Sequence, residues 1–217
     1  MKKQIRNCCI GAGLLVLFVI WTAVLCFVDV NEIGPNSSKV GFATVNAFIH
    51  SITGVHMPLY TLTDWLGLVP ICLMFGFAVL GLLQWIKRKS LQKVDRSLLL
   101  LGGFYIVVTA MYLLFESFVV NYRPILINGR LEASYPSSTT MLVLCVMPTA
   151  VMQFNERIKN AKQKQCVNFA VIVFTVFMVT GRLLSGAHWF SDIIGGALLS
   201  GGLVTLYRSF KNKVARN

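Results

Sequence analysis

Three ionisable residues stand between two apolar stretches near the end of the chain. In the segment GRLLSGAHWFSDIIGG, five residues separate Arg182 from His188, and three separate His188 from Asp192. Ionisable groups at the edge of a membrane span are costly and are commonly functional. A carboxylate that holds one imidazole nitrogen leaves the other free as a nucleophile or base. The spacing predicts such a pair, on one face of a helix that begins near Ala187.

Two further polar segments carry groups that suit a phosphate oxyanion. ESFVVNYRP (116–124) contains Arg123, and SYPSSTT (134–140) contains a Pro-Ser-Ser run. Guanidinium groups offer planar, bidentate donors to phosphoryl oxygens. Serines at the start of a helix offer hydroxyls and free backbone N–H groups. Each feature also has an ordinary interpretation: an interfacial anchor for the arginine, a helix start for the Pro-Ser-Ser run, and a structural pair for His188 and Asp192.

The composition is that of a membrane protein. Of 217 residues, 56% are hydrophobic and 13% are charged, whereas soluble domains are about 45–50% apolar and about 25% charged. The net charge of +12 comes from basic residues clustered between apolar runs, which is typical of topology signals. We expect no nucleic-acid partner, because no aromatic residues interleave with the lysines.

The apolar runs predict an all-α integral membrane protein with a single membrane domain over residues 1–217. A span needs roughly 20 apolar residues. Six spans are expected, at about 10–28, 65–86, 98–120, 139–154, 166–181 and 189–207. Between the first two, apolar residues recur at helical spacing and predict an amphipathic helix on the outer interface. These residues are Val45, Phe48, Ile49, Ile52 and Val55.

The positions of the basic residues predict the orientation. Sixteen of the 20 lysines and arginines precede the first span or follow the second, fourth and sixth. The positive-inside rule makes that side cytoplasmic. We therefore expect a multi-pass cell-membrane protein with both termini inside and the three polar segments facing outward. The sixteen residues are Lys2, Lys3, Arg6, Lys87, Arg88, Lys89, Lys93, Arg96, Arg157, Lys159, Lys162, Lys164, Arg208, Lys211, Lys213 and Arg216.

The order of the three segments resembles the type-2 phosphatidic acid phosphatase superfamily of integral membrane lipid phosphatases. That family's motifs read KxxxxxxRP, PSGH and SRxxxxxHxxxD. The third motif is present at full spacing, with Gly181 in place of its leading serine. The first is represented by Arg123–Pro124 and the second by Pro136–Ser137. The resemblance covers about residues 60–207, which would form the catalytic-type core.

The resemblance implies an enzyme that hydrolyses a lipid phosphomonoester or diphosphate through a phosphohistidine intermediate at the outer face. Candidate substrates are undecaprenyl diphosphate, phosphatidic acid and phosphatidylglycerol phosphate. His188 would attack phosphorus and Asp192 would orient it, with neither a metal nor another cofactor. The implied phosphate-binding residues are Arg123, Ser137, Ser138 and Arg182.

Two positions depart from the family pattern. Glu116 occupies the lysine position of the first motif, and Thr139 occupies the histidine position of the second. In the family, that histidine protonates the leaving oxygen, which threonine cannot do near neutral pH. A diphosphate substrate would need less protonation, Glu116 could supply the proton, or His50 or His56 could approach. Glu116 could equally pair with one of the arginines.

Two alternatives use the same scaffold. A phosphotransferase or headgroup transferase would pass the group from His188 to an acceptor other than water. A non-catalytic relative would bind lipid phosphates without turnover. Intact Arg182, His188 and Asp192 argue against the second alternative, while Glu116 and Thr139 argue for it.

Overall fold

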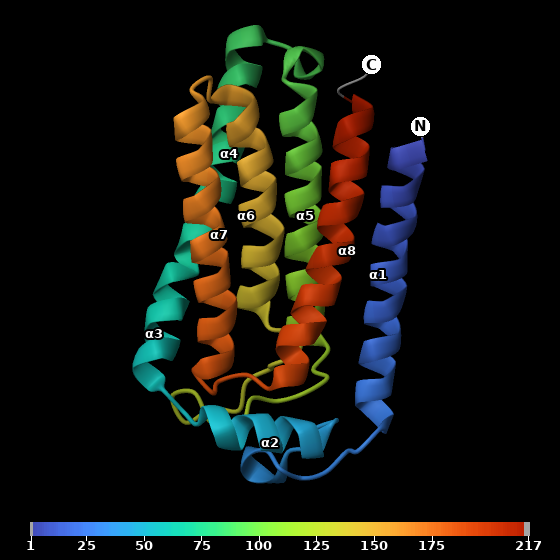
Figure 1. Ribbon diagram of the computed structural model, residues 1–217, viewed down its shortest axis with the longest axis vertical. Coiled ribbons are helices and arrows are strands. Elements are labelled where there is room, and N and C mark those ends of the chain that lie inside the picture. The colour runs from blue at the N-terminus through green and yellow to red at the C-terminus, as the bar shows by residue number, and fades with distance from the viewer. Residues whose placement is uncertain (1, 215–217) are drawn as a thin grey trace.

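The computed structural model describes residues 2–214, and its regular structure is helical (Figure 1). Long helices run side by side, and α2 lies across one end of them. The long helices are α1 (Lys2–Phe27), α3 (Met57–Leu66) with α4 (Leu68–Arg88), α5 (Arg96–Ser117), α6 (Ser138–Arg157), α7 (Ala161–Leu184) and α8 (Phe190–Val214). The short elements are α2 (Ala43–Thr53) and the 3-10 turns Pro35–Ser37 and Leu91–Lys93. The expectation of an all-helical membrane protein is confirmed.

Five of these helical segments are long and apolar enough to cross a membrane. They are Gln4–Phe27, Met57–Arg88, Arg96–Ser117, Ala161–Leu184 and Phe190–Lys213. The expected span at 139–154 lies in α6, which is the sixth long helix but is less apolar. Thr140, Thr149 and Gln153 are buried in α6, which packs against α4, α5, α7 and α8. A helix surrounded by other helices can carry polar side chains that bond within the bundle, so its hydropathy is lower than that of a lipid-facing span.

The second span begins earlier than predicted. Its expected limits were 65–86, but the helix starts at Met57 and only bends at Gly67, between α3 and α4. Polar residues such as Thr63 and Asp64 lower the hydropathy of α3, so the sequence analysis did not recognise α3 as part of the span. Because α3 packs on α7, these polar residues approach the end of α7 that carries Arg182.

A short helix, α2, lies between the first two spans, where an amphipathic helix was predicted; Val55 lies beyond its end. Its apolar residues Val45, Phe48 and Ile52 are exposed, whereas Asn46 is buried. The Asn46 amide donates to Ser191 Oγ (2.9 Å) and accepts from the Ser191 backbone N–H (3.0 Å). This polar pair attaches α2 to the first turn of α8 and leaves the apolar side facing away from the protein. Its location in the outer membrane interface stays a prediction.

The two ends of the bundle differ in character. The start of α1 and the end of α8 lie at the same end of the bundle as the α4–α5 and α6–α7 connections. Helix α2 and the long loops lie at the other end (Figure 1). All the basic clusters of the described chain are therefore at one end, although Arg216 lies outside the described residues. That this end faces the cytoplasm stays a prediction.

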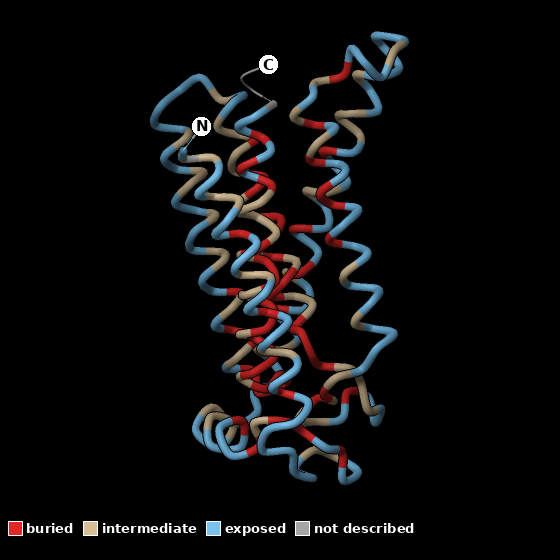
Figure 2. The backbone as a smooth tube through the Cα atoms, turned by 90° about the vertical axis from the view of Figure 1, so that its right-hand side faces the viewer, coloured by how far each residue is buried: buried red, intermediate tan, exposed pale blue. Residues whose placement is uncertain are grey.

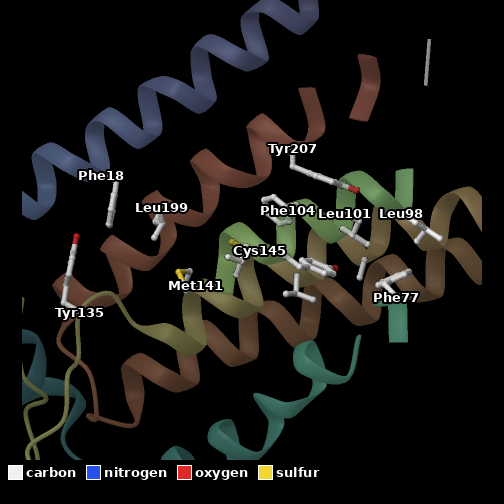
Figure 3. Close-up of a cluster of buried hydrophobic side chains, with 14 of the residues drawn as sticks. Phe18, Phe77, Leu98, Leu101, Phe104, Tyr135, Met141, Cys145, Leu199 and Tyr207 are labelled. Carbon is white, nitrogen blue, oxygen red and sulfur yellow. The ribbon is translucent and has the colours of Figure 1, made fainter. Parts of the chain in front are cut away.

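The core runs along the centre of the bundle (Figure 2). Its cluster extends from Tyr207 near the termini to Tyr135 at the loop end (Figure 3). The Tyr135 ring stacks on Phe18, with centroids 6.2 Å apart, and its hydroxyl lies 2.6 Å from Thr22 Oγ1. A Cβ at Gly195 of α8 would come within 2.4 Å of the Tyr135 ring. The core thereby fixes the segment around Tyr135 against α1 and α8.

The loop between α7 and α8 depends on a glycine. Gly186 has φ +68°, and a Cβ there would lie 2.0 Å from the Gly54 carbonyl oxygen. Gly129 has a similar φ of +74° with nothing within 4 Å of the added carbon. A left-handed conformation costs an L-residue about 1–2 kcal/mol. Of these two glycines, Gly186 is the one where an added side chain would also clash with main chain.

We predict that Gly186→Ala lowers the Tm of the detergent-solubilised protein several degrees more than Gly129→Ala does. Equal shifts would show that the two loops do not approach this closely.

Candidate active site

Three segments distant in the sequence meet at the loop end of the bundle. In the loop between α5 and α6, the Arg123 N–H donates to the Glu132 carbonyl (3.1 Å). This pairing folds the loop back on itself. The Ser137 N–H donates to the Asp192 carbonyl (3.1 Å), and the Trp189 indole N–H donates to the Tyr122 carbonyl (2.8 Å). The expected convergence of the polar segments is present in the structure.

His188 lies in the loop before α8, because that helix begins at Phe190 and not near Ala187 as predicted. The imidazole is 2% exposed. Its Nε2 lies 3.0 Å from Arg123 Nη1 and 3.2 Å from Arg182 Nη2. Guanidinium nitrogens can only donate, so Nε2 must be the acceptor and the ring proton must be on Nδ1. The reactive lone pair of His188 therefore faces both arginines.

Ser134 lies between His188 and Asp192. Its Oγ is 3.1 Å from His188 Nδ1 and donates to Asp192 Oδ2. The direct separation of Nδ1 and Oδ2 is 3.8 Å, and the same carboxylate oxygen accepts from the Trp189 N–H (2.9 Å). The predicted direct contact between imidazole and carboxylate is thus replaced by a hydroxyl bridge. Ser134 stands in the SYPSSTT segment, but it fills no motif position and nothing else in the sequence distinguishes it.

The surroundings of His188 favour its neutral form. Burial, followed by the positive charges of Arg123 and Arg182, lowers the pKa of His188 well below its ordinary value of 6.5. For a histidine, a lowered pKa means that the ring stays neutral as the pH falls through 6.5. Neutral imidazole with an unprotonated Nε2 is the form that can act as a nucleophile.

Each arginine has a carboxylate partner, and in neither case is it Glu116. Arg123 Nε lies 3.2 Å from Glu132 Oε2, and Arg182 Nη1 lies 3.6 Å from Asp64 Oδ1. Buried charges are tolerated only when they are paired, and Arg182 is 1% exposed. These two ion pairs compensate the positive charges of the guanidinium groups.

Helix α3 adds residues that the sequence analysis did not name. Arg182 Nη1 donates to Thr63 Oγ1 at 3.4 Å, on the same side as Asp64. The Tyr60 ring lies 4.8 Å from the Arg182 guanidinium carbon and 5.9 Å from that of Arg123. Three residues at positions i, i+3 and i+4 of α3 therefore face the arginine pair. Only the early start of this helix could have pointed to them.

Within the described chain, the remaining predicted residues form no hydrogen bond or ion pair with the arginines. The Ser137 hydroxyl caps α6 by accepting from the Thr140 N–H (3.5 Å). Ser138 and Glu116 line a shallow cavity that also includes Ser134. The Thr139 methyl faces the α3–α4 bend, 3.7 Å from where a Cβ would stand on Gly67.

Neither of the other histidines replaces the missing motif histidine. The His50 ring packs 5.4 Å from the Trp189 ring, and burial lowers the pKa of His50. His56 precedes α3 with an exposed side chain, and its backbone N–H donates to the Ser185 carbonyl (3.0 Å). Within residues 2–214, neither ring is hydrogen-bonded to Arg123 or Arg182.

Comparison with known proteins gives a consistent result. Residues 116–216 match the model of the PAP2 superfamily. The fold is similar to the crystal structure of a transmembrane PAP2-type phosphatidylglycerolphosphate phosphatase from Bacillus subtilis, with a TM-score of 0.59 and 20% identity. That likeness covers 94% of this chain and 96% of the other. No protein of curated function matches the sequence. The PAP2 superfamily match spans all three motif segments of this multi-pass membrane chain.

Proposed function

We propose that the protein is a membrane phosphatase that hydrolyses a lipid phosphate or diphosphate through a phosphohistidine intermediate. The observation that carries the proposal is the placement of His188 Nε2 between two guanidinium groups. An imidazole lone pair directed at two phosphate-binding donors is positioned to attack a phosphorus atom held by those donors.

The first step follows from the contacts of His188. Phosphoryl oxygens would take over the N–H donors of Arg123 and Arg182 that now point at Nε2. Nε2 would then form a bond to phosphorus as the bond between phosphorus and the lipid oxygen breaks. The ring gains positive charge, which Ser134 and Asp192 stabilise through the Nδ1 proton. Fixed donors and charges of this kind supply most of the catalysis in phosphoryl transfer.

Water completes the cycle by attacking the phosphohistidine and releasing inorganic phosphate. The guanidinium groups would stabilise the phosphoryl oxygens in this step as well. In the family pattern, Ser137 and Ser138 would also bind these oxygens, and their location beside Ser134 and Asp192 makes this feasible after a small shift. Phosphatidic acid, phosphatidylglycerol phosphate and undecaprenyl diphosphate are the substrates to compare, with the site facing the outer leaflet.

One observation favours a transferase as the second candidate. Asp64 and Glu132 are paired with the two arginines, and Asp192 lies behind His188. Three carboxylates around two guanidinium groups suit a cationic headgroup or an acceptor amine better than a strongly positive site would. In that case the phosphoryl group or headgroup would pass to the acceptor in place of water.

The nucleophile is tested by His188→Ala. Phosphate release from the three lipids by detergent-purified protein, measured with chelator present, should fall by on the order of 10⁴-fold or more, as for other nucleophiles. His56→Ala is the matched control, because its side chain is exposed at the same end of the bundle, and it should retain activity. If wild type and His188→Ala release equally little phosphate while lipid phosphate still binds, the phosphatase proposal fails, and the transferase and the non-catalytic alternatives remain.

The hydroxyl bridge is tested by Ser134→Ala. Its removal leaves the His188 ring without a fixed orientation, and misplacement of a reacting group by about 1 Å costs up to roughly 10²-fold. We expect kcat to fall by about that factor with little change in KM, because Ser134 positions the imidazole. Ser200→Ala removes an equally buried hydroxyl that donates to the main-chain carbonyls of Met141 and Gly196. The same loss of kcat in both variants would contradict a specific role for Ser134.

A further inference from the structure

The site has a nucleophile and an oxyanion-binding pair but no histidine to protonate a leaving oxygen. A lipid alkoxide is a poor leaving group, and a general acid contributes on the order of 10²–10⁴ in rate. Position 139 is threonine, and Glu116 has no ion pair to either arginine within the described chain. Two carboxylates do contact the arginines, Glu132 and Asp64.

Glu132 and Asp64 contact different nitrogen atoms of their guanidinium partners. Glu132 contacts Arg123 at Nε, whereas His188 contacts the same group at Nη1. Asp64 contacts Arg182 at Nη1, next to the Nη2 that points at His188. A phosphoryl group bound by both terminal nitrogens of Arg182 would therefore have the imidazole toward one side and Asp64 toward the other. In-line displacement places the leaving oxygen opposite the nucleophile.

The Asp64 backbone also lies close to Thr139, the residue that replaces the missing histidine. It is one turn before Gly67, and a Cβ on Gly67 would lie 2.9 Å from the Asp64 carbonyl oxygen and 3.7 Å from Thr139 Cγ2. The bend between α3 and α4 thus packs directly on the residue that replaces the histidine. The Asp64 side chain is 58% exposed, so it is accessible to the lipid oxygen, whereas His188 is enclosed.

From this geometry we propose that Asp64 is the general acid for the leaving lipid oxygen; the proposal rests on the phosphatase function proposed above. When the phosphoryl group takes the Nη1 donor of Arg182, the carboxylate faces a second anion. Two anionic groups held this close retain one proton between them. That proton passes to the lipid oxygen as the bond from phosphorus to that oxygen breaks and its electron pair stays on oxygen.

The same carboxylate serves the second step. Asp64 takes a proton from the attacking water as the water oxygen bonds to phosphorus. The electron pair of the bond between phosphorus and nitrogen returns to His188 Nε2, and inorganic phosphate leaves. The net reaction consumes one water and restores the neutral imidazole.

The test varies the basicity of the leaving group. Wild type, Asp64→Asn and Asp64→Glu are assayed for kcat/KM, which reports the steps up to departure of the leaving group. The substrates are phosphatidic acid, undecaprenyl diphosphate and p-nitrophenyl phosphate. Asp64→Asn should lose about 10²–10⁴-fold on phosphatidic acid, but less than about 10-fold on the other two, whose leaving groups depart without a proton. Asp64→Glu should recover part of the loss on phosphatidic acid.

Glu132→Gln is the matched control, because it removes the carboxylate partner of the other arginine. Its effect should be the same factor for all three substrates. An equal loss on all substrates in Asp64→Asn would show that Asp64 only organises Arg182, and would overturn the proposal, as would no loss on any of them. Wild type that releases phosphate from none of the three would instead contradict the phosphatase function itself.

Discussion

The arrangement of the site depends on one constraint: His188 Nε2 faces two groups that can only donate hydrogen bonds. Arg123 and Arg182 come from the α5–α6 loop and from the end of α7, and both point at this nitrogen. The constraint fixes the tautomer, because the ring proton must be on Nδ1. It also opposes protonation of the ring, since the pKa of His188 is lowered by burial and by the two positive charges. A neutral imidazole whose Nε2 lone pair is directed at two guanidinium groups follows from these contacts.

Much of the loop end serves to hold this contact. Asp192, two residues into α8, accepts from the Trp189 N–H, in the manner of an acidic residue that caps a helix start. The Ser134 hydroxyl links that carboxylate to the imidazole of His188 through hydrogen bonds to both. At the same end of the bundle, the pair between Asn46 and Ser191 attaches α2 to the same turn of α8. His188 is therefore supported by the helix start behind it and by the elements that enclose it.

The sequence predicted the helical class and most of the helix positions because long apolar runs depend on local composition alone. It also singled out Arg182, His188 and Asp192 by the spacing of one family motif, and Arg123 by the Arg–Pro pair of another. The structure brings these four residues together. The start of α8 was misplaced by three residues, since the Asp192 carboxylate accepts from the Trp189 N–H and caps the helix where it begins at Phe190.

What the sequence missed depends on tertiary placement. The role of Ser134 arises only when its loop folds against α8, and no local pattern distinguishes this hydroxyl from its neighbours in the SYPSSTT segment. Helix α3 was taken for an outer connection because Thr63 and Asp64 lower its hydropathy. Those polar residues are the ones that contact Arg182. The polar residues that connect α3 to the site are therefore the same residues that prevented its recognition as part of the second span.

The most direct test of the account is to trap the phosphorylated enzyme. Wild type and His188→Ala would be mixed with lipid substrate carrying a radiolabelled terminal phosphate and quenched within the first turnover. The account predicts label on the wild-type protein that survives base and is released by acid, as expected for phosphohistidine, and no label on His188→Ala. Label that remains in the variant, or turnover by a wild type that never becomes labelled, would contradict attack by His188.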